Sequence, residues 1–104
     1  MLRGLFLQPF DGGSHRAFLE GLLRHTRFDW TVLALPPGEW RKRMRRGAEE
    51  LAAQLEAVPG SFDFLVATDM LDLADFLALT RRRLGGVPAM VYFHENQVTY
   101  PRLR

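Results

Sequence analysis

Four short apolar runs alternate with stretches in which apolar residues recur at helical spacing, and this alternation restricts the possible folds most strongly. The apolar runs, each the length of a buried strand, cover residues 2–7, 30–35, 62–67 and 87–93. The helical stretches cover residues 14–25, 40–58 and 71–79. Apolar strands separated by helices form parallel sheets that are covered on both faces. The sequence therefore predicts an α/β, Rossmann-like three-layer fold, with a parallel sheet of about four strands and helices on both faces.

The length of 104 residues fits a single domain over residues 1–104. Hydrophobic residues make up 47% of the chain and charged residues 25%, which disfavours a disordered protein. The absence of cysteine excludes disulfides, zinc ribbons and iron–sulfur ligation, and we expect no metal ion. The first residues lack a signal-peptide cleavage site, and no apolar run approaches the ~18 residues of a membrane span. We therefore expect a cytoplasmic protein without a membrane partner.

The net charge of +2 conceals an uneven distribution of charge along the chain. Residues 1–48 carry a net charge of +5, residues 49–80 of −7 and residues 81–104 of +4. Arginine supplies 13 of the 14 cations, and its planar guanidinium suits phosphate, although this bias alone selects no function. Three consecutive arginines, at positions 81–83, are expected at the C-terminal end of the third helix, where cations face the helix dipole favourably.

A glycine turn follows the first apolar run and opens the first helix, with the sequence Gly12, Gly13, Ser14 and His15. Paired glycines let the backbone approach an anion, and a helix N-terminus attracts phosphate. The spacing is not G-x-G-x-x-G, which excludes the dinucleotide-binding fingerprint. The alternative is that the glycines only supply the positive φ of a turn. Ser14 or Asp11 is the expected cap of this helix.

Five cations lie in the opening turns of the second helical stretch, between Trp40 and Arg46. Cations are unfavourable at the positive end of a helix dipole, and a bound phosphate or nucleic acid would relieve that cost. The alternative is a solvated charged face, since Arg45 and Arg46 each have a glutamate four residues later.

A polar cluster, His94, Glu95, Asn96 and Gln97, directly follows the fourth apolar run. Ligands of open parallel sheets gather at the carboxyl ends of the strands, where this cluster is expected. A His–Glu pair can handle a proton, and Asn and Gln amides can hydrogen-bond sugar hydroxyls. Asp69 follows the preceding run and is a further candidate, with a helix N-cap as its alternative role. A purely structural histidine is the alternative for His94.

The strings Phe10–His15, Leu35-Pro36 with Trp40, Tyr92–Gln97 and Tyr100-Pro101 closely resemble the N-terminal domain of the tRNA-queuosine α-mannosyltransferase family. The resemblance covers nearly the whole chain in the order of the family. It implies a retaining glycosyltransferase of GT-B fold, which moves mannose from GDP-mannose to queuosine in tRNA. It implies a nucleotide-sugar donor and tRNA as partners, and no further cofactor.

The resemblance, together with the strand-end position of Asp69 and the cation cluster that contains Arg41, assigns roles to the candidate residues. The glycine turn, Gly12–His15, matches the loop expected to face the diphosphate of the donor. His94 and Glu95 become catalytic candidates, with His94 acting as a base or only orienting the sugar. The expected substrate contacts are Gly12, Gly13, Ser14, His15, Asp69, Asn96 and Gln97. The expected RNA contacts are Trp40, Arg41, Arg43 and Arg45.

The family continues beyond the position of Arg104, with the rest of the acceptor domain and a donor-binding domain. We therefore expect a fragment or a split subunit that needs a C-terminal domain or a second subunit and transfers negligible sugar alone. The alternative is a stand-alone module that binds RNA or phosphate without catalysis. A receiver-like signalling domain is a weaker possibility, since Asp11 and Asp69 follow strands but the usual acidic pair is missing.

Overall fold

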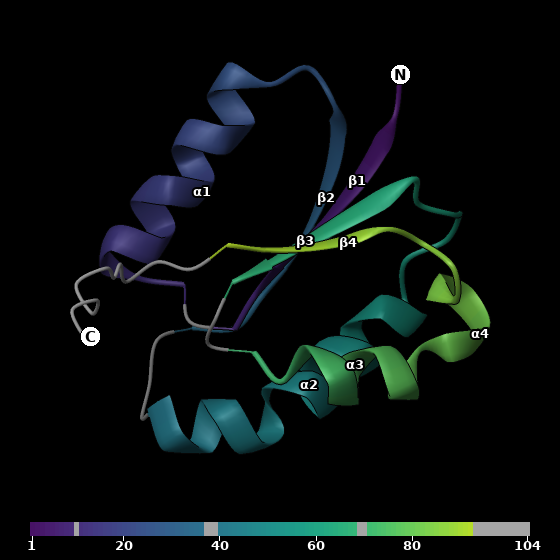
Figure 1. Cartoon of the computed structure of the whole chain (residues 1–104). Helices are drawn as coiled ribbons and strands as arrows, with labels where there is room; N and C mark the ends of the chain where they lie inside the picture. Colours follow the sequence, from purple (N-terminus) through teal and green to yellow (C-terminus); the bar gives the residue numbers. More distant parts are fainter. Residues whose placement is uncertain (10, 37–39, 69–70, 93–104) are drawn as a thin grey trace, which may run out of the picture.

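A computed structural model describes the chain except for residues 10, 37–39, 69–70 and 93–104, and for residues 40–45 it describes the backbone only. The described elements follow in the order β1 (Arg3–Gln8), α1 (Gly13–His25), β2 (Asp29–Ala34), α2 (Trp40–Glu56), β3 (Phe64–Thr68), α3 (Leu73–Leu79), α4 (Arg81–Leu84) and β4 (Ala89–Tyr92). The four strands form one parallel sheet in the order β2-β1-β3-β4 (Figure 1). The α/β, Rossmann-like prediction is confirmed.

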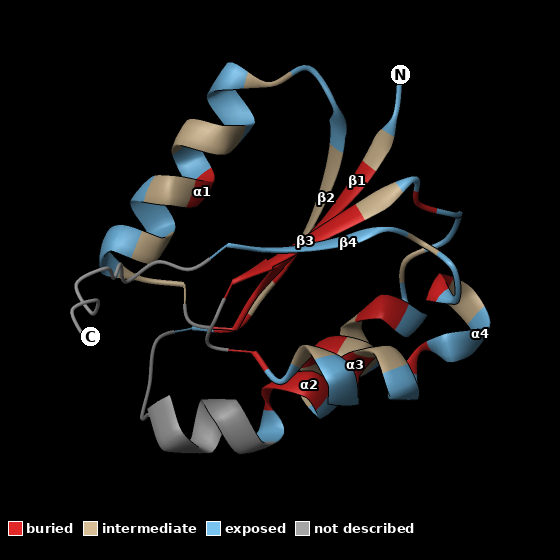
Figure 2. Ribbon diagram, in the orientation of Figure 1, coloured by how far each residue is buried: buried red, intermediate tan, exposed pale blue. Residues whose placement is uncertain are grey.

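Helices cover both faces of the sheet, with α1 on one face and α2, α3 and α4 on the other (Figure 1). Side chains of a strand alternate between the faces, so Leu5 and Leu7 pack toward α2 and α3, whereas Phe6 packs against Leu19 of α1. All three strand residues are fully buried (Figure 2). Burial on both faces explains why this strand reads as a continuous apolar run.

An aromatic cluster fills the α1 face around Gly4. The rings of Trp30 and Phe64 lie edge to face, 5.3 Å apart. A Cβ at Gly4 would lie 2.7 Å from the ring of Phe64 and 2.8 Å from that of Trp30. A larger residue at this position of β1 would therefore require the rings to shift.

Two arginines hold the turn between α2 and β3. The guanidinium of Arg3 donates to the carbonyl oxygen of Ser61 at 3.1 Å, and that of Arg83 donates to those of Leu55 and Gly60, both at 2.7 Å. Arg83 thus binds the C-terminal end of α2. Helix α3 ends at Leu79, as predicted, and arginines 81–83 follow its C-cap residue, Thr80, but they form a separate short helix, α4, that the sequence analysis did not predict.

Two predicted element boundaries also need correction. Helix α3 begins at Leu73, because the carboxylate of Asp72 accepts a hydrogen bond from the amide of Asp75 at 3.0 Å. Phe62 was expected in the third strand but precedes it, although its side chain is buried in the core.

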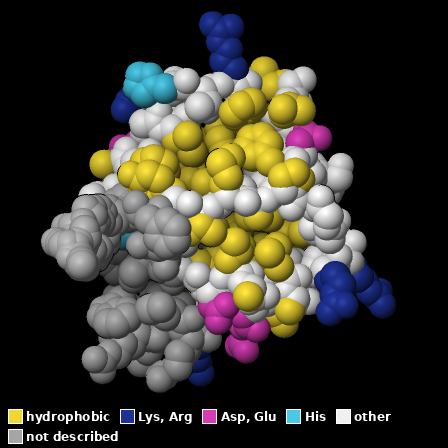
Figure 3. All heavy atoms as spheres, viewed as in Figure 1, with side chains coloured by type: hydrophobic (Ala, Val, Ile, Leu, Met, Phe, Trp, Pro, Cys, Tyr) yellow, Lys and Arg dark blue, Asp and Glu magenta, His cyan; other side chains and the backbone are white. Residues whose placement is uncertain are grey.

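Strand β4 lies at the edge of the sheet, and its four residues are all exposed (Figure 2). Met90 is 61% exposed, and with Val91 and Tyr92 it borders an apolar groove against Phe18 and Leu22 of α1. Hydrophobic side chains gather in this region of the surface (Figure 3). Within the described part of the chain, the prediction of a covered sheet therefore does not extend to β4. None of the described helices is long and apolar enough to span a membrane.

Candidate functional site

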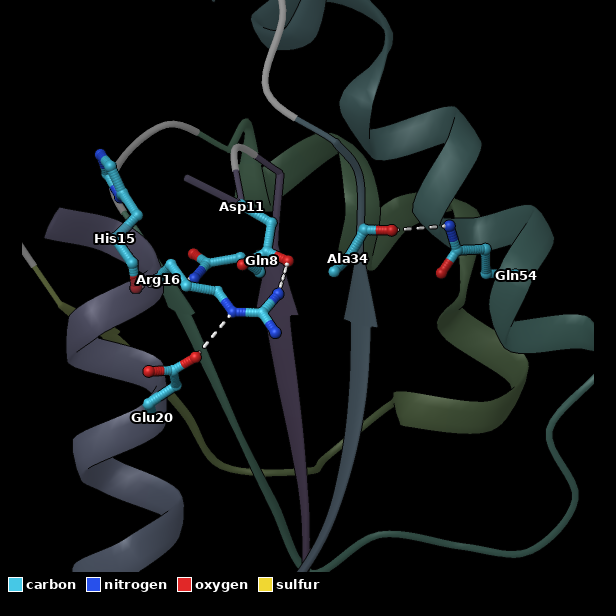
Figure 4. Close-up of polar contacts among 7 residues, drawn as sticks. All are labelled: Gln8, Asp11, His15, Arg16, Glu20, Ala34 and Gln54. Carbon is cyan, nitrogen blue, oxygen red and sulfur yellow. Dashed lines mark hydrogen bonds and ion pairs between the residues drawn. The ribbon is translucent and has the colours of Figure 1, made fainter. Parts of the chain in front are cut away.

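The loop between β1 and α1 lies at the carboxyl edge of the sheet, where parallel strands present their ligand-binding loops. Backbone hydrogen bonds fix this loop against the end of β2. The amide of Leu35 donates to the carbonyl oxygen of Gln8 at 2.9 Å, and the amide of Asp11 donates to that of Leu35 at 3.0 Å. Gln54 of α2 donates to the carbonyl oxygen of Ala34 at 3.0 Å, which ties α2 to the same edge (Figure 4).

The N-terminus of α1 is formed by the glycine turn. Gly12 is the N-cap, with extended backbone, and Gly13 has φ +56°, a left-handed conformation that favours glycine. Because the N-cap residue is Gly12, the prediction of Ser14 or Asp11 at this position is wrong. The amide of His15 donates to the carbonyl oxygen of Gly12 at 3.1 Å, which closes the first turn. A Cβ at Gly13 would meet no atom of the described residues within 4 Å, so among these residues the positive end of the helix is accessible.

Asp11 does not cap the helix because its carboxylate pairs with Arg16. The guanidinium of Arg16 lies 2.5 Å from Asp11 and 3.0 Å from Glu20 (Figure 4). Hydrogen bonds to Glu20 and Asp11 raise the pKa of Arg16 above its usual value. The pairing offsets the negative charge of Asp11 beside the helix N-terminus, so that charge repels an approaching anion less.

Two buried polar residues end the neighbouring strands at this edge. Gln8 is fully buried, and its side-chain amide donates to the carbonyl oxygen of His15 at 2.9 Å, which holds the first turn of α1 on β1. Thr68 ends β3 and is 1% exposed. The sequence analysis assigned neither residue to the site. The feature of the sequence that could have identified them is that each is a polar residue at the end of an apolar run.

The structure brings four of the predicted site residues together, namely Gly12, Gly13, Ser14 and His15, in the turn and first helical residues after β1. The predicted residues Asp69, His94, Glu95, Asn96 and Gln97 lie outside the described residues. Trp40, Arg41, Arg43 and Arg45 lie in the opening turns of α2, as expected, and their side chains are likewise outside the description.

The described residues contain no group of three or more histidine, aspartate or glutamate side chains placed to hold a metal ion. The described site consists of a helix N-terminus, the carboxylate of Asp11 paired with Arg16, and buried amide and hydroxyl groups. Such an arrangement suits an anionic ligand that also carries hydroxyl groups.

Comparisons with known proteins identify the relatives of this chain. Residues 3–104 match the family model described as tRNA-queuosine alpha-mannosyltransferase N-terminal. A curated tRNA-queuosine alpha-mannosyltransferase of Drosophila melanogaster is 37% identical over 98 residues, which cover 93% of this chain and 26% of that protein. The chain thus spans about a quarter of the length of this relative. No solved structure matches the chain significantly.

Proposed function

This chain belongs to the tRNA-queuosine alpha-mannosyltransferase family, and we propose that it is the acceptor-side part of an enzyme that transfers mannose from GDP-mannose to queuosine in tRNA. The family match over residues 3–104 carries the proposal. We further propose that the complete enzyme has the two Rossmann-like domains of a GT-B glycosyltransferase and acts in the cytoplasm with retention of configuration.

The N-terminus of α1 is the proposed contact for the donor diphosphate. The positive end of its dipole favours a negative charge, and no atom of a described residue lies within 4 Å of the position that a Cβ would take at Gly13. Negative charge grows on the diphosphate as the bond to the sugar breaks. Amides fixed in advance stabilise that charge more in the transition state than in the bound donor, which accelerates the reaction.

The residues outside the description keep the roles that the family resemblance implies. His94 is proposed to orient the sugar or to take the proton of the acceptor, with Glu95 as its partner. Asp69, Asn96 and Gln97 are proposed to hydrogen-bond substrate. No metal enters this scheme.

The start of α2 is the proposed tRNA contact, through Trp40, Arg41, Arg43 and Arg45. The first turn of this helix contains no acidic residue, so the positive end of its dipole and its cations add together. Nearer the start of the same helix, a Cβ at Gly47 would lie 3.5 Å from Pro9, the residue that follows β1, so this part of α2 lies at the carboxyl edge of the sheet. RNA bound there would lie on the side of the domain that carries the glycine turn.

We propose that this chain alone is inactive, because it corresponds to only one part of the two-domain enzyme. The chain corresponds to about a quarter of its relative, and the proposed C-terminal domain, or a second subunit, would hold most of the nucleotide. The experiment that tests the function is a panel of nucleotide sugars and tRNAs incubated with the full-length gene product, followed by mass analysis of the digested nucleosides. Transfer of a hexose supports the enzyme, whereas tRNA binding without transfer supports the alternative, a non-catalytic RNA-binding module.

A further inference from the structure

The face of the sheet under α1 changes from apolar to polar at the last position of two neighbouring strands. Phe6 of β1 pairs in register with Val66 of β3, and both side chains pack in the α1 cluster. Gln8 and Thr68 lie two residues further along the same strands, so the alternation of side chains places them on this same face. Neighbouring strands are ~4.8 Å apart, so the two polar side chains are adjacent.

Two further contacts support this placement. The side-chain amide of Gln8 donates to the carbonyl oxygen of His15 in α1. Thr68 pairs in register with Tyr92 of β4, and the ring of Tyr92 stacks on Phe18 of α1, with centroids 3.8 Å apart. The last residues of β1, β3 and β4 therefore lie beside one another and face the first turns of α1.

The oxygen atoms of this polar pair have unused hydrogen-bonding capacity. Gln8 is fully buried and Thr68 is 1% exposed. Within the described part of the chain, neither Oε1 of Gln8 nor Oγ1 of Thr68 has a hydrogen-bond partner. Buried polar atoms in folded proteins almost always have a partner, in the protein, in an ordered water or in a ligand. A single group that bridges these adjacent residues would satisfy both oxygens.

The chemistry of the two atoms identifies that group. The amide nitrogen of Gln8 is already used by His15, so this side chain offers only an acceptor, and the hydroxyl of Thr68 can donate or accept. A group that bridges the pair must donate to Gln8, and it can either accept from Thr68 or donate to it. A hydroxyl meets this requirement, whereas an ionised phosphate oxygen cannot donate to Gln8. A cationic ammonium group could donate to both oxygens, but the positive end of the α1 dipole beside the pair disfavours it.

We propose that Gln8 and Thr68 form a hydroxyl-binding site beneath the first turn of α1. The hydroxyl has two possible sources, a resident water or a sugar hydroxyl of the substrate, and only the second rests on the proposed function. In either case the site lies next to the helix N-terminus proposed to hold phosphate. In this arrangement the N-terminus of α1 binds the charged phosphate, and the side chains at the ends of β1 and β3 bind a neutral hydroxyl.

The first test is a pair of crystal structures of the full-length protein, one ligand-free and one with GDP-mannose, at a resolution that shows waters. We expect an oxygen atom at hydrogen-bond distance, about 2.8 Å, from both Gln8 Oε1 and Thr68 Oγ1. The Thr68→Ser variant should keep this oxygen, and Thr68→Val, which has a similar shape without the hydroxyl, should lose it. No oxygen between the two atoms in either wild-type structure would overturn the proposal, whatever the donor of the enzyme is.

The second test distinguishes the source of the hydroxyl, by calorimetric titration of the same proteins with GDP-mannose and with GDP. If the sugar supplies it, Thr68→Val weakens GDP-mannose binding at least about tenfold and changes GDP binding less than about twofold. If water supplies it, the bridging oxygen is present without ligand and both affinities stay the same. Failure of wild-type protein to bind either nucleotide would contradict the proposed donor, while the crystal structures would still decide the hydroxyl site.

Discussion

The guanidinium of Arg16 contacts the carboxylate of Asp11 across the turn between β1 and α1, with Nη1 of Arg16 2.5 Å from Oδ2 of Asp11. The Asp11 side chain is only 14% exposed, whereas that of Arg16 is 55% exposed. The aspartate therefore lies inside the loop, and the arginine offsets its charge from the solvent side. The positive end of α1 beside it remains attractive to an anion.

Replacement of Arg16 by Gln should weaken the binding of GDP to the full-length protein about fivefold, because Asp11 would then oppose the diphosphate at close range. The loss should shrink at high salt, which screens exposed charges. Arg24→Gln is a matched control, since Arg24 is an exposed residue near the other end of α1. GDP affinity is measured by titration calorimetry. Equal losses of affinity in the two variants would show that the Arg16–Asp11 pair has no specific effect on GDP binding.

Replacement of Gly13 by Ala should destabilise the protein by about 1–2 kcal/mol, because φ +56° is unfavourable for a residue with a Cβ. It should also weaken GDP binding, since the first amides of α1 would shift. Gly21→Ala is the control, because Gly21 lies inside the same helix with open space around it. That variant should raise stability by about 0.5–1 kcal/mol and leave GDP binding unchanged. Thermal unfolding and calorimetry check both effects, and a Gly13→Ala protein with unaltered GDP affinity would contradict the proposed contact.

Replacement of Gly4 by Ala should cost about 1–3 kcal/mol, because the new methyl group meets the rings of Phe64 and Trp30. The smaller side chain of Phe64→Leu should relieve part of that clash. A double-mutant cycle measured by urea unfolding should therefore give a favourable coupling energy for the pair. Strictly additive losses would show that the clash is absent.

Replacement of Arg43 by Glu should weaken tRNA binding and reduce the slope of log K against log salt by about one, because a phosphate contact releases counterions. Arg82→Glu provides the same charge change on α4, at an exposed position away from the glycine turn. A filter-binding series over several salt concentrations compares the two variants. If Arg82→Glu has the larger effect, the RNA contact lies on α4 rather than at the start of α2.

The order of elements was predictable because its signals are local. Apolar runs, helical spacing and terminators such as Pro59-Gly60 can each be read over a few residues. Element ends were less predictable, as Phe62 shows. Its apolar side chain indicates burial, and it is buried, but it packs near Arg3 before the strand begins. An apolar pattern reports burial rather than strand pairing.

Polar contacts between distant residues were not predictable, in the fold or at the site, because they depend on tertiary structure. Arg83 binds Leu55, 28 residues away, and no spacing rule indicates such a contact. Gln8 was not assigned to the site, because the sequence does not show that α1 covers the end of β1 and accepts a hydrogen bond from this side chain. The glycine turn was found at the correct place, since its residue types and its position before a helix are both visible in the sequence.

The most direct test of the central claim is the mass of the queuosine nucleoside after queuosine-containing tRNA is incubated with GDP-mannose and the full-length protein. The account predicts a gain of one hexose with the full-length protein, a severe loss of that gain in a folded His94→Ala variant, and no gain with the 104-residue chain alone. Full-length protein that binds this tRNA and GDP-mannose but leaves the nucleoside mass unchanged would contradict the account.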